Sequence, residues 1–273
     1  MPSMETLFPS DLFVDKPIFV TGGGSGINLG IARAFARLGA PVGLCGRTLE
    51  KLEKAKAELE GLGAKVYVGA CDVRDAEATA DVIQAAGEAL GPIHTLVCGA
   101  AGNFPCPANA LSPNGFKSVV DIDLVGSFNA CRAAFPQLEK SRGNVIFVSA
   151  GQSMYAYALQ AHVGAAKAGV DQLMRNLALE WGPHGIRANS ICPGPIAETE
   201  GMRRLAPPNS EQQLAETVPL KRLGTVDDIG HCAAFLASPL ASYVSGTVIM
   251  ADGGQNLGGS ALLTQVFMDA AGR

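Results

Sequence analysis

The chain has 273 residues, of which 48% are hydrophobic and 17% are charged, and its formal net charge is -4. This composition can fill a sizeable core and excludes long disordered tracts. The negative net charge argues against a protein that acts mainly on nucleic acid, although a local basic patch can still bind an anionic ligand.

The seven cysteines are scattered, odd in number and without the close pairs that hold metals. No signal peptide is recognisable, so a reducing cytoplasm is expected. Residues 93–116 and 143–166 lack Asp, Glu, Lys and Arg, but polar residues run through both stretches and no membrane span is predicted. The four histidines do not cluster, and no metal site is predicted.

Short β-rich runs alternate with helical segments along the whole chain. Strands are predicted at residues 18–20, 41–45, 65–70, 95–98, 145–148, 186–192 and 248–250. Helices are predicted at about 27–38, 49–62, 76–90, 113–138, 160–181 and 226–236. Because no linker interrupts the alternation, the sequence predicts one α/β domain with a doubly wound parallel sheet of about seven strands. The domain is expected to span residues 1–273, with a core over about 12–257 and a tail over 258–273.

A glycine-rich segment, Thr21-Gly-Gly-Gly-Ser-Gly26, lies where the first strand turns into the first helix. Missing Cβ atoms let the backbone approach a pyrophosphate, whose charge the helix start favours. This position in a long βα alternation predicts a Rossmann-type dinucleotide site rather than an ordinary tight turn. Arg47, at the tip of the second strand, would attract a 2′-phosphate, so NADP(H) is favoured over NAD(H); a solvated surface arginine is the alternative.

Further motifs follow the later strands and carry a family resemblance. Three of them are Cys98-Gly-Ala-Ala-Gly102, Pro193-Gly-Pro195 and Ala251-Asp-Gly-Gly254. With these, nearly the whole chain resembles the short-chain dehydrogenase/reductases. Within that family it resembles the 2,4-dienoyl-CoA reductases, particularly the peroxisomal type. The specific matches include Ala100-Ala-Gly-Asn-Phe104, Asp121-Ile-Asp123, Leu159-Gln160 and Thr199-Glu-Gly201.

Two positions depart from the general family pattern. The third glycine of the cofactor turn is replaced by Asn28, whose side chain would crowd the pyrophosphate. The tyrosine expected four residues before the active-site Lys167 is replaced by Val163, which cannot donate a proton. The dienoyl-CoA reductases share this absence, and the resemblance implies that an aspartate of the peroxisomal type activates a water instead. Asp123 occupies the matching position.

The resemblance implies a catalytic set of Asn103, Asp123, Ser149 and Lys167. After hydride addition to the diene, negative charge moves to the thioester oxygen, where the Asn103 amide would donate a hydrogen bond. Asp123 would polarise the water that protonates the dienolate. Lys167 would hold the nicotinamide ribose hydroxyls, and Ser149 the water or the nicotinamide side. For Asp123, an exposed helix carboxylate or a mere partner of Lys167 is the alternative.

The resemblance also implies the residues that bind the two ligands. For NADP(H) they are Gly22, Gly23, Gly24, Ser25, Gly26, Ile27, Arg47, Asp72, Val73, Lys167, Pro193, Gly194, Ile196 and Thr199. For the acyl-CoA they are Phe104, Ser112, Pro113, Asn114, Arg74 and Arg204. The two arginines suit a highly anionic coenzyme A.

The sequence therefore predicts an enzyme that reduces a conjugated 2,4-dienoyl-CoA, or a similar unsaturated acyl-CoA, with NADPH. One alternative is another NADPH-dependent short-chain carbonyl or alkene reductase, with Tyr155 or Tyr157 as an unusual acid. The other alternative is a non-catalytic cofactor-binding regulator, which is supported by the two departures from the family pattern, Asn28 and Val163. The resemblance implies a homotetramer. Since the chain ends in Ala-Gly-Arg rather than the peroxisomal Ser-Lys-Leu, the cytoplasm is the expected location.

Overall fold

The computed structural model describes residues 8–200, 202 and 210–260. In this part of the chain, seven strands form one parallel sheet in the order β3-β2-β1-β4-β5-β6-β7. The strands are β1 (Ile18–Thr21), β2 (Val42–Gly46), β3 (Val66–Ala70), β4 (Thr95–Cys98), β5 (Asn144–Val148), β6 (Arg187–Pro193) and β7 (Val248–Ala251). The predicted doubly wound parallel α/β sheet is confirmed.

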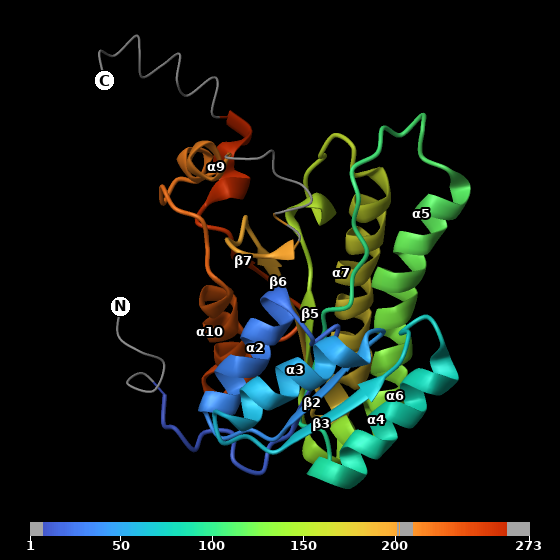
Figure 1. Ribbon diagram of the computed structural model, residues 1–273, viewed down its shortest axis with the longest axis vertical. Coiled ribbons are helices and arrows are strands. Elements are labelled where there is room, and N and C mark those ends of the chain that lie inside the picture. The colour runs from blue at the N-terminus through green and yellow to red at the C-terminus, as the bar shows by residue number, and fades with distance from the viewer. Residues whose placement is uncertain (1–7, 201, 203–209, 261–273) are drawn as a thin grey trace.

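Helices cover both faces of this sheet (Figure 1). One face carries α2 (Gly26–Arg37), α3 (Leu49–Glu60) and α10 (Val226–Ala237). The other carries α4 (Ala76–Leu90), α6 (Gly126–Ser141) and α7 (Ala161–Trp181). Helix α5 (Pro113–Val120) packs on α7, and the short α9 (Glu211–Thr217) lies near the end of β7.

The central strands are buried on both faces, which explains their near-continuous apolar sequence. Every residue of β1, β4 and β5 is buried, whereas β3 and β7, at the two edges of the sheet, are only half-buried. Two hydrophobic clusters result, one on each face. They hold the sheet rigid and leave the carboxyl ends of the strands as the place for polar side chains.

The segment predicted as one helix over residues 113–138 is interrupted. Ser112 caps α5 by accepting a hydrogen bond from the Gly115 N–H (3.0 Å), and a π-helical turn, η1 (Asp121–Val125), then separates α5 from α6. Such turns are frequent at functional sites. Here the turn buries Asp123, while Asp121 lies closer to the surface and pairs with Lys117. The prediction of one regular helix is therefore corrected.

The order of the strands reverses at β1, which lies between β2 and β4, and this is the topological switch point of the sheet. Ligands of open α/β sheets bind outside the carboxyl ends of the strands at such a point. Thr21, at the end of β1, connects this strand with the loop after β4, because its hydroxyl accepts hydrogen bonds from the N–H groups of Gly99 (3.0 Å) and Ala100 (3.1 Å).

Candidate active site

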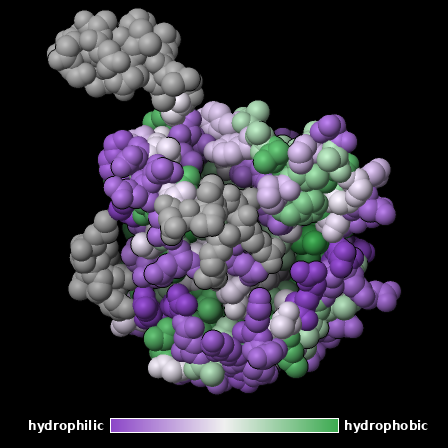
Figure 2. All heavy atoms as spheres, turned by 45° about the horizontal axis from the view of Figure 1, so that its top comes forward, coloured by the Kyte–Doolittle hydropathy of each residue, from purple (hydrophilic) through white to green (hydrophobic). Residues whose placement is uncertain are grey.

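Three adjoining clefts of about 160, 340 and 450 Å³ follow the carboxyl edge of the sheet. The first lies beside Arg47 and Asp72, the second runs from the glycine turn to Lys167, and the third reaches Tyr157 and Leu214. Neighbouring clefts share lining residues, so they form one groove. An elongated groove at the switch point suits a dinucleotide with a second ligand beside it. On the face drawn in Figure 2, hydrophilic side chains predominate and hydrophobic ones are interspersed.

The glycine turn fits a dinucleotide pyrophosphate. Gly22 has a φ of +67°, and a Cβ atom there would lie 2.9 Å from the Ala100 Cα. The Asn28 amide donates to the carbonyl oxygens of Gly22 (3.2 Å) and Gly99 (2.8 Å) and so bridges the two loops. Gly99 makes room for it, since a Cβ at this position would clash with the Asn28 amide. The Asn28 amide is therefore held against the two loops, and because Asn28 also lines the second cleft, crowding of the pyrophosphate stays a prediction.

The first cleft carries opposite charges. Arg47 is exposed and lines the first cleft with Asp72 and Val73. The Arg74 side chain donates to both Asp72 oxygens (3.0 and 2.6 Å), and these hydrogen bonds hold the pKa of Asp72 below its usual value. Arg74, expected at the acyl-CoA, thus pairs with a residue of the first cleft and lines none of the three clefts, and its contact with the acyl-CoA stays a prediction.

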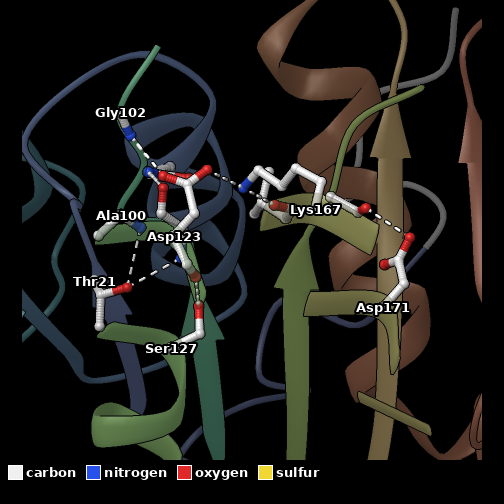
Figure 3. A network of polar contacts seen from close by, with 11 residues as sticks. Thr21, Ala100, Gly102, Asp123, Ser127, Lys167 and Asp171 are labelled. Carbon is white, nitrogen blue, oxygen red and sulfur yellow. Dashed lines mark hydrogen bonds and ion pairs between the residues drawn. The ribbon is translucent and has the colours of Figure 1, made fainter. Parts of the chain in front are cut away.

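Asp123 and Lys167 form a buried ion pair in the second cleft (Figure 3). The Lys167 Nζ lies 3.2 Å from the Asp123 Oδ2, and the two residues are 6% and 1% exposed. Asp123 Oδ1 accepts from the Gly102 N–H (2.7 Å), and Lys167 Nζ donates to the Val148 carbonyl (2.9 Å). The exposed helix carboxylate considered from the sequence is excluded. Mutual pairing stabilises both charges in the protein interior.

Val163 and Ser149 complete the wall beside this pair. Val163 is buried with Val119 and lines the second cleft, so an aliphatic side chain occupies the place of the usual phenol. Ser149 donates to the Asp171 Oδ2 (2.9 Å), and Asp171, labelled in Figure 3, belongs to α7 as Lys167 does. Asp171 is 2% exposed, and its Oδ1 has no hydrogen-bond partner.

Sequence reasoning missed Asp171. The available signal was its position four residues after Lys167, which places two side chains on one face of a helix.

Asn103 borders both the second and the third cleft. It follows Gly102, whose N–H is held by Asp123, so the buried carboxylate also fixes the loop that carries Asn103. The Asn103 Oδ1 is buried without a partner. Asn103, Asp123, Ser149 and Lys167 all line the second cleft. The structure therefore brings the four predicted catalytic residues to one place.

The predicted nicotinamide-side residues lie further along the groove. Those that line the third cleft are Ile27, Pro193, Gly194, Ile196 and Thr199. Of the glycine turn, Gly22, Gly24, Ser25 and Gly26 line the first or second cleft. Gly23 lies inward, where a Cβ would lie 2.6 Å from the Leu44 Cδ2.

The predicted acyl-CoA residues are more dispersed. Phe104 is 38% exposed, and its ring meets the His162 ring edge to face at 4.4 Å. Ser112, Pro113 and Asn114 form the exposed start of α5 and line none of the three clefts. Arg204 lies outside the described residues.

Across residues 8–200, 202 and 210–260, no three His, Cys, Asp or Glu side chains gather as metal ligands would. Over the same residues, no helix has the length and apolar character needed to cross a bilayer.

Known proteins resemble this chain in sequence over most of its length. A family model described as Enoyl-(Acyl carrier protein) reductase matches residues 22–256. The peroxisomal 2,4-dienoyl-CoA reductase of Saccharomyces cerevisiae is 45% identical over 248 residues, which cover 89% of this chain and 85% of the relative. The Mus musculus enzyme of that name is 45% identical over 257 residues, covering 93% and 88%. A probable 2,4-dienoyl-CoA reductase of Bacillus subtilis is 43% identical over 246 residues, covering 88% and 96%.

Solved structures share the fold. A citronellol catabolism dehydrogenase of Pseudomonas aeruginosa superposes with a TM-score of 0.81 at 38% identity, covering 92% of this chain and 98% of the other. An NADPH-bound short chain oxidoreductase of the same organism, described as containing an atypical catalytic center, gives a TM-score of 0.83 at 29% identity, covering 89% and 97%.

The comparisons correct one expectation and settle another. Relatives from yeast, mouse and Arabidopsis thaliana are named as peroxisomal, so the expected cytoplasmic location is wrong and the relatives point to peroxisomes. The family model and the relatives each cover most of the sequence. The chain therefore belongs to the short-chain dehydrogenase/reductase family.

Proposed function

We propose that this protein reduces a 2,4-dienoyl-CoA with NADPH to an enoyl-CoA. The observation that carries the proposal is the buried Asp123–Lys167 pair, which faces the groove beside Val163 in place of a phenol. Without a phenol, ordinary carbonyl–alcohol exchange lacks its proton donor. Reduction of a conjugated thioester needs a different arrangement, because negative charge develops on the thioester oxygen during the reaction and must be stabilised there. The names of the relatives from yeast, mouse and Bacillus subtilis support this substrate class.

The cofactor would lie along the first and second clefts, with its nicotinamide end beside the predicted residues Pro193, Ile196 and Thr199 at the start of the third. Gly22, Ser25 and Gly26 would hold the pyrophosphate, Arg47 the 2′-phosphate, Asp72 the adenine amine and Lys167 the ribose hydroxyls. When bound, NADPH supplies the hydride that reduces C5 of the diene. The NADPH-bound relative supports this choice of cofactor.

The side chains would manage the charge that develops on the substrate. The Asn103 amide would donate to the thioester oxygen, a type of contact whose removal costs about 10²–10³ in kcat in other enzymes. Asp123 Oδ2, which has no hydrogen bond beyond its ion pair, would accept from a water that protonates the α-carbon. The adjacent Lys167 ammonium would return a proton to the resulting hydroxide. The product would be a (3E)-enoyl-CoA, as the names of the peroxisomal relatives state for those enzymes.

A substrate panel tests this proposal. NADPH consumption is measured with 2,4-dienoyl-CoAs, 2-enoyl-CoAs and simple ketones, and NADH replaces NADPH in a parallel series. We expect turnover of the dienoyl-CoAs with NADPH, and little with the ketones. Preferred turnover of ketones would refute the proposal.

Tyr157 favours a second candidate, a carbonyl reductase with an unusual acid. It lines the third cleft, and burial raises the pKa of its phenol, which keeps the phenol protonated as a donor. Ketone turnover abolished by Tyr157→Phe would support this candidate. The third candidate, a non-catalytic regulator, predicts NADP(H) binding without turnover of any member of the panel.

We further propose a homotetramer with a role in fatty acid metabolism, built from one domain over residues 1–273 with its core at about 12–257. Exposed apolar side chains on α5, η1 and α6 support a subunit contact; they are Phe116, Val125 and Phe128. Light scattering of the purified protein gives the subunit number directly.

A further inference from the structure

Buried polar atoms without a hydrogen-bond partner gather around the groove. Among the described residues they include Asn103 Oδ1, Asp123 Oδ2, Gln160 Oε1, Asp171 Oδ1 and Asn256 Oδ1. Leaving such a group unsatisfied destabilises the folded state, so each needs an explanation. Gln160 differs from Asp123 and Asp171, because it is neutral, lines the third cleft and has no part in the chemistry above.

The amide of Gln160 has a defined orientation. Gln160 is 6% exposed and directly precedes α7. Its Nε2 donates to the carbonyl oxygens of Leu159 (3.2 Å) and, through a long bond, Phe104 (3.5 Å). Carbonyl oxygens cannot donate, so the nitrogen must face them and the oxygen must face the other way. Gln160 Oε1 is therefore a fixed acceptor, buried and without a donor.

The surroundings of Gln160 hold this acceptor in place. Leu159 has a φ of +66°, a strained conformation for a residue with a side chain. Its carbonyl also accepts from the Cys106 N–H (3.0 Å), which ties the loop after Asn103 to the start of α7. The Phe104 ring packs against His162 on the same side. An acceptor on such a braced segment keeps its position when a ligand binds.

The third cleft suits a neutral ligand. None of the described residues that line it is charged, and most of its wall is apolar. The reacting dienoyl thioester contains no N–H or O–H group and cannot satisfy Gln160. The next polar group along a coenzyme A thioester is the amide two carbons beyond the sulfur, and its N–H is a neutral donor.

We propose that Gln160 Oε1 accepts a hydrogen bond from the N–H of the amide nearest the thioester sulfur. This inference rests on the proposed function and deepens it. The contact makes Gln160 a positioning residue: it fixes the arm of the substrate and thereby sets the thioester carbonyl beside the Asn103 amide, in the part of the groove that both residues line. It also selects thioesters whose arm carries an amide at this spacing.

Two small substrates that differ in one atom group test the proposal. Both carry the same 2,4-dienoyl thioester; one has an N-acetylcysteamine arm, and in the other an ester oxygen replaces the amide N–H. In the wild-type protein the amide substrate is expected to show about tenfold higher kcat/KM, as one buried hydrogen bond of ~1.4 kcal/mol implies. In Gln160→Leu and Gln160→Met the ratio should fall close to one. Gln152→Leu, a change to another glutamine of the same cleft, should keep the wild-type ratio.

Other outcomes would overturn the inference in distinguishable ways. A tenfold ratio that persists in both Gln160 variants would show that the amide binds elsewhere. An equal loss with both substrates would reduce Gln160 to a brace for the loop of Asn103. A weaker Kd for NADPH in Gln160→Met, measured by fluorescence, would assign the acceptor to the cofactor. No turnover of full-length dienoyl-CoA by the wild-type protein would instead reject the proposed function itself.

Discussion

Asp123 shows how one contact can serve both stability and chemistry. Its carboxylate holds the Gly102 N–H on one oxygen and the Lys167 ammonium on the other. Removing one member of a buried pair leaves an uncompensated charge, which is more costly than the loss of an exposed pair. The same two side chains face the groove where the phenol is missing, so a change at Asp123 should alter both activity and stability.

Asp123→Asn is expected to lower kcat for a 2,4-dienoyl-CoA by about 10²–10⁴, the usual range for a group that assists proton transfer. The amide keeps the size of the side chain but cannot balance the Lys167 charge. Asp121→Asn is the matched control, since Asp121 pairs with Lys117 at the surface end of the same turn. Steady-state rates at saturating NADPH decide the matter. Equal rates for Asp123→Asn and the wild type would remove Asp123 from the mechanism.

Ser149→Ala tests the contact between the groove and Asp171. The Asp171 carboxylate is buried, and Ser149 is the hydrogen-bond donor to its Oδ2. Loss of this hydrogen bond should lower the free energy of unfolding, measured by urea denaturation, by about 1–3 kcal/mol. Ser153→Ala is the control, because the Ser153 hydroxyl is buried without a partner and its removal should be close to neutral. A larger loss in Ser153→Ala than in Ser149→Ala would contradict this account.

At the scale of the elements, the helices and strands were predictable where one period dominated. Helix α4 matches its prediction at both ends, since regular apolar spacing follows the Asp75 cap. The π-helical turn η1 was not predictable, because the burial of Asp123 depends on contacts with Gly102 and Lys167 that are distant in sequence. Asp171 was missed for a related reason, because it lies in α7 while its partner Ser149 follows β5, 22 residues earlier in the sequence.

Helix α10 offers a test of a capping interaction. Thr225 and Asp228 form a capping box at its start, and Arg222 donates to both Asp228 oxygens (2.8 and 3.0 Å). The Arg222 contact, with help from Thr225, lowers the pKa of Asp228 from 3.8 to about 2. A depressed folded-state pKa stabilises the protein above the unfolded value and loses this effect as the pH falls.

Asp228→Ala should therefore destabilise the protein by about 1 kcal/mol at neutral pH, the typical value of a helix cap. The difference from the wild type should persist above about pH 5 and disappear as the pH falls through 3.8 towards 2. Urea unfolding at several pH values measures it. Asp227→Ala is the control, as Asp227 meets Arg37 only across an exposed distance of 3.8 Å. A difference that grows on acidification would contradict the assigned sign.

At the scale of the whole molecule, the groove is a consequence of topology. Because the order of the strands reverses at β1, the glycine turn, the loop of Asn103 and the start of α7 all meet at the carboxyl edge of the sheet. The glycine pattern and the order of strands and helices were sufficient to predict this edge, whereas the four residues that meet in the second cleft were implied by the family resemblance. The side-chain pairings at the edge were not predictable; the ion pair between Arg74 and Asp72 is one of them.

Ligand-dependent stability tests the groove as a unit. A ligand that binds only the folded state adds about 2.7 kcal/mol at 100 times its Kd, which raises the Tm by several degrees. NADP⁺ should produce this rise, and NAD⁺ at the same concentration a smaller one, because Arg47 is exposed at the adenosine end where a 2′-phosphate would lie. Arg47→Ala should make the two nucleotides nearly equivalent, whereas Arg132→Ala, on the exposed side of α6, should preserve the difference. If NADP⁺ and NAD⁺ shift the wild-type Tm equally, Arg47 does not select the cofactor. If neither nucleotide shifts it, the glycine turn does not hold a pyrophosphate, and the groove must serve another ligand.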